Sequence, residues 1–200
     1  MTPLTKLGPR EPNGRARHER SLPLILAYAL AYAVASLLDL WTTHWVLITG
    51  GSEKNVFMLS EHGYVLHRSL IITLLGGLIM IAAFAFGVRR ADQVSDRWLH
   101  RPLASFGLLY LNPWAARARD RAPLHMLAQA MAFVALRLLA ALNNLAIALG
   151  GVGPIGWLVQ QAGVVTSPML GFVLVIFPLF AAITLCMAPG SAALIRRLRD

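Results

Sequence analysis

Four long apolar stretches alternate with short polar or basic segments along this chain. A helix needs roughly 20 residues, at about 1.5 Å of rise each, to cross about 30 Å of membrane hydrocarbon. Each stretch meets that length, so the pattern predicts an all-α membrane protein folded as a four-transmembrane-helix bundle. The predicted spans are Leu22–Ile48, Tyr64–Val88, His125–Leu149 and Pro168–Ala188.

The composition agrees with this interpretation. Of the 200 residues, 57% are hydrophobic and 14% are charged, whereas a soluble domain carries about 25% charged and about 45 to 50% apolar residues. Cys186 is the only cysteine, which excludes an intramolecular disulfide and a zinc site built from several cysteines.

The basic residues are unevenly distributed between the predicted spans. Five Lys and Arg lie in residues 1–21, seven lie between Arg89 and Arg121 and three lie in the last five residues. The positive-inside rule then predicts that both termini and the middle loop are cytoplasmic in a bacterial-type inner membrane. The loops at 50–63 and 150–167 would face outward. The basic residues that give the net charge of +9 would thus contact anionic lipid headgroups, and we expect no nucleic acid partner.

The same distribution predicts how the chain is organised. Residues 1–21 read as a flexible basic tail, 22–188 as the membrane domain and 189–200 as a second basic tail. Within the basic loop 89–124, apolar residues recur three or four apart among arginines, which favours one or two amphipathic segments in the headgroup layer. An ordinary basic loop with anchoring tryptophans is the alternative. These apolar residues are Trp98, Leu103, Phe106, Tyr110 and Trp114.

Two ionisable residues of opposite sign, Asp39 and Arg137, lie well inside apolar spans. A charge at such a position costs about 2.5 to 3.5 kcal/mol on insertion scales, so it normally faces the bundle interior and finds a partner. Both residues lie in spans that run outward, at similar depth. The sequence therefore predicts a buried ion pair between them in the outer half of the bilayer.

Further polar residues extend this predicted pair into a polar seam. Ser36, Asp39 and Thr43 recur at helical spacing and share one face of the first span. Small residues of the second span, such as Gly76 and Gly77, would allow close helix packing. Besides the pair, the predicted seam contains Ser36, Thr42, Thr43, His44, Glu53, Asn55, Asn143 and Asn144.

Candidate chemistry at this seam is weakly specified. His44, His62 and His67 could contribute to a metal site with nearby carboxylates, but no HExxH motif is present and wet interfacial residues are favoured instead. Asp39 could act in proton transfer, but burial favours its neutral form whereas Arg137 favours its charged form. A structural ion pair is therefore favoured over a catalytic group, and no cofactor is predicted.

The stretch "LLDLWTTHWVLITGGSEKN" resembles the small integral membrane proteins of domain-of-unknown-function family 5658. In that family an Asp and a Thr in the first helix precede a Gly-rich turn and a Glu-x-Asn-Pro segment. Asp39, Thr42 or Thr43, Glu53 and Asn55 match this pattern, and Val56 stands where the proline would be. The resemblance implies a helical membrane domain with a shared polar cluster and implies no activity.

Together these features predict a polytopic inner-membrane protein that acts as an accessory, scaffold or binding subunit. Its environment is the lipid bilayer, and a second membrane protein or another copy of the chain remains open as a partner. An outward-facing membrane enzyme, such as a metal-dependent hydrolase, is one alternative. A small transporter is the other, and it would need a wet path that reaches both sides of the membrane.

Overall fold

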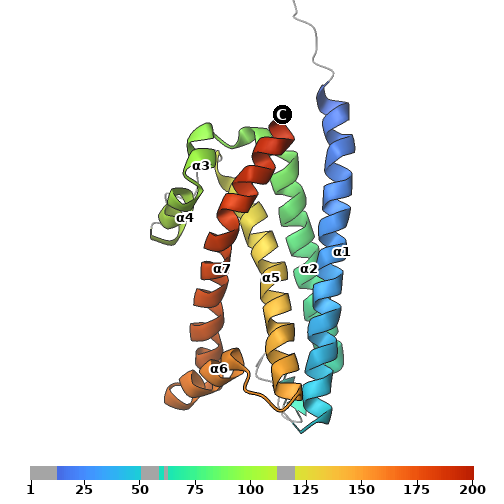
Figure 1. Ribbon diagram of the computed structural model, residues 1–200, viewed down its shortest axis with the longest axis vertical. Coiled ribbons are helices and arrows are strands. Elements are labelled where there is room, and N and C mark those ends of the chain that lie inside the picture. Colours follow the sequence, from blue (N-terminus) through green and yellow to red (C-terminus); the bar gives the residue numbers. More distant parts are fainter. Residues whose placement is uncertain (1–12, 51–58, 61–62, 112–119) are drawn as a thin grey trace, which may run out of the picture.

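The computed structural model describes residues 13–50, 59–60, 63–111 and 120–200. Four long helices form its body (Figure 1). Each of them is long and apolar enough to cross a membrane, so the predicted helical multi-pass membrane protein with four candidate spans is confirmed. The four helices are α1 (Asn13–Ile48), α2 (Leu66–Arg89), α5 (Ala122–Ala148) and α7 (Pro168–Arg199).

Short elements connect these helices. A 3-10 helix η2 (Ala91–Gln93), α3 (Asp96–His100) and α4 (Pro102–Leu111) lie between α2 and α5. Strands β1 (Leu59–Ser60) and β2 (Gly63–Tyr64) form an antiparallel pair between α1 and α2. The segment 150–167, expected as a loop, contains a 12-residue helix, α6 (Pro154–Val165). The helix α6 is too short to span a bilayer and lies at one end of the bundle (Figure 1).

Both predicted tails are partly helical. The helix α1 already begins at Asn13, and α7 continues through Pro189 as far as Arg199. Proline inside a helix removes one backbone hydrogen bond, but Ala192 and Ile195 beyond it are completely buried. Burial of this face offsets the missing bond, and residues 189–199 are therefore a packed helical end rather than a tail.

The two ends of the bundle differ in what they carry. The first residues of α1 and α5 and the last residues of α2 and α7 lie at the end that bears α3 and α4, which we call the α3 end (Figure 1). The opposite end carries α6 and is called the α6 end. The helices α1 and α5 turn back there through Gly50 and Gly150, whose φ angles are 87° and 82°. A left-handed conformation favours glycine because it has no Cβ.

Helix α5 is the centre of the bundle and contacts α1, α2, α6 and α7. Its small residues Ala128, Ala130 and Ala132 are completely buried, which allows the neighbouring backbones to approach closely. At the α3 end these contacts merge into an apolar core with α2, α7 and the short helices. Its completely buried side chains include Phe106, Leu124, Leu127, Ala188, Ala192 and Ile195.

The predicted interfacial segment contains two short helices, α3 and α4, whose aromatic side chains pack on the bundle instead of anchoring in the headgroup layer. Trp98 is 7% exposed and Phe106 is 0% exposed, and both belong to the apolar core. The indole Nε1 of Trp98 donates to Asp120 Oδ2 at 2.8 Å. These two aromatics attach α3 and α4 to the bundle, whereas Leu103 is exposed. The Tyr110 side chain and all of Trp114 lie outside the described part.

Candidate functional site: an ion pair beside a one-sided cavity

The structure brings Asp39 of α1 and Arg137 of α5 together. Arg137 Nη1 donates to Asp39 Oδ2 at 2.6 Å, and each side chain is 13% exposed. This distance is that of a charge-assisted hydrogen bond. Arg137 Nη2 donates to Thr73 Oγ1 of α2 at 3.2 Å, so the guanidinium connects three of the four long helices.

Two aromatic residues support this arrangement. The Tyr32 hydroxyl of α1 donates to the Thr73 carbonyl oxygen at 2.6 Å, which joins α1 to α2 directly. The Arg137 guanidinium carbon lies 5.7 Å from the Phe133 ring centroid, within the range of a cation–π interaction. Arg137 is thus surrounded by a carboxylate, a hydroxyl and an aromatic face, which compensate for its removal from water.

The two neighbouring asparagines predicted for the seam have different partners. Asn144 Nδ2 donates to Thr43 Oγ1 at 2.9 Å and connects α5 to α1. Asn143 Oδ1 accepts from the backbone N–H groups of Ile155 and Gly156, at 3.0 and 3.4 Å. The first N–H groups of a helix have no partner within the helix. Asn143 therefore caps α6 from another helix and fixes where α6 begins.

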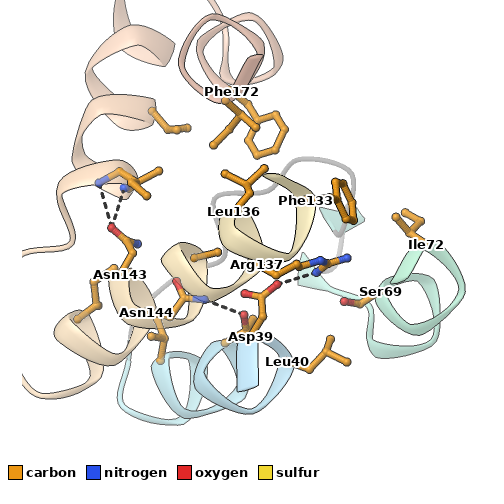
Figure 2. A pocket seen from close by; sticks show the side chains of 18 residues that line it. Asp39, Leu40, Ser69, Ile72, Phe133, Leu136, Arg137, Asn143, Asn144 and Phe172 are labelled. Carbon is orange, nitrogen blue, oxygen red and sulfur yellow. Dashed lines mark hydrogen bonds and ion pairs between the residues drawn. The ribbon is translucent and has the colours of Figure 1, made fainter. Parts of the chain in front are cut away.

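These polar groups border a cavity of about 320 Å³ at the α6 end (Figure 2). Asp39, Thr43, Ser69, Arg137 and the two asparagines contribute its polar lining. The remaining lining is largely apolar and includes side chains of α6 and α7. These apolar residues are Leu40, Val46, Ile72, Phe133, Leu136, Ala140, Ile147, Ile155, Val159, Phe172 and Ile176.

Close packing separates the cavity from the α3 end. The rings of Tyr28 and Phe84 stack with their centroids 4.3 Å apart, and both residues are part of the apolar core. A Cβ at Gly77 would lie 2.4 Å from Tyr32 Cε1, so α1 and α2 are in tight contact there. The cavity lining includes no residue of α3 or α4, and the cavity is therefore one-sided.

The other residues named from the sequence are dispersed. Ser36 is buried without a hydrogen-bond partner for its Oγ among the described residues. Thr42 Oγ1 donates to the Leu38 carbonyl oxygen of its own helix at 2.8 Å. His44 and His67 are exposed, and neither lines the cavity. Glu53, Asn55 and His62 lie outside the described residues.

The site contains residues that sequence reasoning did not assign to it. These residues are Thr73, Ser69 and Tyr32. The α6 residues were missed because a loop was expected. The signal for Thr73 was present, since Ser69 and Thr73 are four residues apart and share a helix face. Pro154 after Gly153 also marks a helix start, because proline suits the first helical position.

A second polar contact lies at the α3 end. His125 Nε2 lies 3.1 Å from Ser105 Oγ, and both residues are buried. The Ser105 hydroxyl lies 2.7 Å from the Pro102 carbonyl oxygen, and when its proton is in that bond it accepts from the Nε2–H of His125. A nucleophilic serine needs the opposite arrangement, in which the histidine accepts the hydroxyl proton. This contact attaches α4 to α5.

The arrangement also limits metal chemistry. Across residues 13–50, 59–60, 63–111 and 120–200, no three His, Cys, Asp or Glu side chains gather closely enough to hold a metal ion.

Comparisons with protein-family models, curated proteins and solved structures found no match. The resemblance of the first span to family 5658 therefore stays a prediction.

Proposed function

We propose that the chain is a binding subunit of a bacterial-type cytoplasmic membrane and that the cavity beside Asp39 and Arg137 is its binding site. The observation that carries the proposal is a cavity that combines a buried ion pair with an apolar wall. Ligand pockets are typically about 300 to 1,000 Å³, mostly apolar, and carry a few polar groups that orient the ligand. The cavity of about 320 Å³ fits this description.

The distribution of charge supports an orientation with both termini in the cytoplasm. Exposed arginines of α2, the α3 segment and α7 gather at the α3 end, whereas Arg68 lies near the start of α2 at the α6 end. The positive-inside rule then assigns the α3 end to the cytoplasm and the cavity to the outer half of the bilayer. The exposed arginines would contact anionic headgroups. They are Arg89, Arg90, Arg97, Arg101, Arg196, Arg197 and Arg199.

The geometry favours binding over the two alternatives. Transport would need a path from one side of the membrane to the other, but the apolar core fills the α3 end. A metal-dependent hydrolase would need His44 or His67 beside Asp39, and both histidines are exposed and outside the cavity lining. An accessory role, in which binding alters a partner membrane protein or a second copy of the chain, is consistent with the same site.

The proposal is tested by filling the cavity. Ala140 lines it, whereas Leu138 is 41% exposed on the same helix at similar depth. Ala140→Phe therefore adds a ring inside the cavity, and Leu138→Phe adds a ring toward lipid. Each protein is purified in a mild detergent and extracted with organic solvent, and the extract is analysed by mass spectrometry.

We expect a small molecule that is present in the wild type and Leu138→Phe extracts and at least about fivefold depleted in the Ala140→Phe extract. Equal amounts in all three extracts, or no copurifying molecule in any of them, would overturn the binding role. Thermal unfolding of the three proteins verifies that they are folded. Fusion of a reporter to the C-terminus tests the orientation separately, since a periplasmic C-terminus would contradict it.

A further inference from the structure

The described lining of the cavity carries no net charge, and this property restricts what the cavity can bind. We propose that its ligand is an uncharged amphiphile whose head group both donates and accepts hydrogen bonds, as a primary amide or a glyceryl ester does. The inference rests on the proposed binding function and specifies the chemical class of its ligand. Three features of the lining carry it: the balance of charge, the remaining hydrogen-bonding groups and the position of the apolar wall.

The balance of charge comes from the ion pair. Among the described residues that line the cavity, Asp39 and Arg137 are the only Asp, Glu, Lys or Arg side chains, and their charged atoms are 2.6 Å apart. An anionic head group would bring its charge beside Asp39, and a cationic one would bring its charge beside Arg137. In either case one charge would be left uncompensated in a low-dielectric site, which is costly. An uncharged head group avoids this cost.

Hydrogen-bonding groups of both kinds remain available on the same wall. Asn143 uses its Oδ1 to cap α6, and its Nδ2 donates to no other described residue. Asn144 uses its Nδ2 for Thr43, and its Oδ1 accepts from no other described residue. Figure 2 shows these two amides and Ser69 around the same cavity as the ion pair. A head group with both a donor and an acceptor would satisfy these partly buried amide groups, and each hydrogen bond formed would contribute to binding.

The apolar wall determines where the rest of the ligand lies. Ile155 and Val159 of α6 and Phe172 and Ile176 of α7 line the cavity together with Leu136. Figure 2 shows Phe172 and Leu136 on one side of the cavity and Asp39 and Ser69 on the other. A ligand with a polar head beside the ion pair would therefore place its apolar part against α6 and α7. The volume, near the lower limit of ligand pockets, suits a head group and a short apolar segment.

Three photoreactive probes with the same ten-carbon chain test the head-group class. They are diazirine derivatives of decanamide, decanesulfonate and decylammonium, which are uncharged, anionic and cationic at pH 7. The full-length protein is reconstituted in nanodiscs of zwitterionic lipid and irradiated with each probe. Labelling of cavity peptides from α5 and α6 is quantified by mass spectrometry and divided by labelling of the lipid-exposed residues Leu74 and Leu78 of α2. This ratio removes differences in partitioning into the bilayer.

We expect the amide probe to label the cavity at least about fivefold more strongly than either charged probe. Asn144→Ala should reduce amide labelling about fivefold to tenfold, because one hydrogen bond is worth about 1 to 1.4 kcal/mol. Equal or stronger labelling by the sulfonate or the ammonium probe would overturn the head-group class while leaving a binding site. If Ala140→Phe reduces labelling by none of the three probes, the cavity is not a binding site and the proposed function itself fails.

Discussion

Among the described residues, Arg137 at the α6 end and Arg121 at the α3 end are both largely shielded from solvent, and the two arginines have different surroundings. At the α6 end Arg137 has a carboxylate partner, contacts Thr73 and borders a cavity. At the α3 end Arg121 is only 2% exposed, and its guanidinium carbon lies 5.4 Å from the Trp98 ring centroid. Its Nε has no hydrogen-bond partner in the described part of the chain.

This difference shows two ways in which one small bundle accommodates a buried charge. The α3 end is a filled apolar core in which the Trp98 ring lies beside Arg121, so added or removed volume should be costly there. The α6 end uses polar partners from three helices and leaves space beside them. Close packing and open space thus lie at opposite ends, and substitutions at matched positions should respond differently.

The largest expected effect comes from breaking the ion pair. Asp39→Asn or Arg137→Gln alone should destabilise the protein by about 3 to 5 kcal/mol, because removal of one partner leaves a buried charge uncompensated. The double variant should recover more than half of the loss, since neither charge then remains. Thermal unfolding in nanodiscs measures the three variants. Arg196→Gln, at an exposed arginine of the α3 end, is the control and should change stability by less than about 0.5 kcal/mol.

A double variant that loses as much as the sum of the two single variants would contradict this interaction. It would mean that Asp39 and Arg137 stabilise the bundle independently, through Thr73 or other partners.

A smaller loss is expected from adding one methyl group at the α3 end. A Cβ at Gly87 would lie 2.4 Å from Leu127 Cγ and 2.8 Å from the Pro123 carbonyl oxygen. The backbone oxygen is not free to move aside, so Gly87→Ala should cost about 1 to 3 kcal/mol. Gly76→Ala is the matched control on α2, because its nearest neighbour would be 3.7 Å away. The control should be neutral or stabilising by up to about 1 kcal/mol, and equal denaturation midpoints for both variants would refute the tight contact.

The attachment of α6 should contribute about 1 kcal/mol. Asn143→Ala removes the oxygen that accepts from Ile155 and Gly156, a change comparable to the loss of a helix N-cap. Hydrogen exchange at these two amides should become faster by about fivefold. Asn144→Ala removes the bond to Thr43 and should leave exchange at both amides unchanged. If both variants accelerate exchange equally, Asn143 has no specific role in holding α6.

The smallest effect is expected where space is already available. Ala140→Leu adds volume inside the cavity and should cost less than about 1 kcal/mol, because overpacking is costly only in a filled core. Ala128→Leu makes the same change at a completely buried position of α5 and should cost about 1 to 3 kcal/mol. Chemical denaturation of the two variants compares the ends directly. A larger loss of unfolding free energy for Ala140→Leu than for Ala128→Leu would contradict the difference between the two ends.

The sequence was sufficient to predict the long helices and the proximity of two residues far apart in the chain. Each span is a long apolar run, and a charge in such a run needs a partner, which pointed to Asp39 with Arg137. His44 could also have been excluded from the seam. It follows Asp39 by five residues, which at about 100° per residue places it roughly 140° around the helix, and it is exposed.

Other features depend on tertiary contacts that no local pattern contains. Tryptophan and phenylalanine among arginines are typical of a membrane interface. Trp98 and Phe106 are buried instead, because α3 and α4 pack on α7 and Phe106 packs on His125 of α5. The cavity could not be predicted without α6, which forms part of its wall. The position of α6 depends on Asn143 and on the close contact between α6 and α7. A Cβ at Gly171 would lie 2.4 Å from the Gly163 backbone nitrogen, so two separate glycines permit that contact.

The separation of the ion pair along the chain has a consequence for biosynthesis. Arg137 follows Asp39 by 98 residues, and ribosomes add about 5 to 20 residues per second. The first span is therefore made about 5 to 20 s before its arginine partner exists. During that interval Asp39 must be neutral, hydrated at the membrane surface or held by the insertion machinery. When α5, the third span, enters the membrane, Arg137 pairs with Asp39. The ion pair therefore stabilises the inserted first helix only after α5 has been inserted.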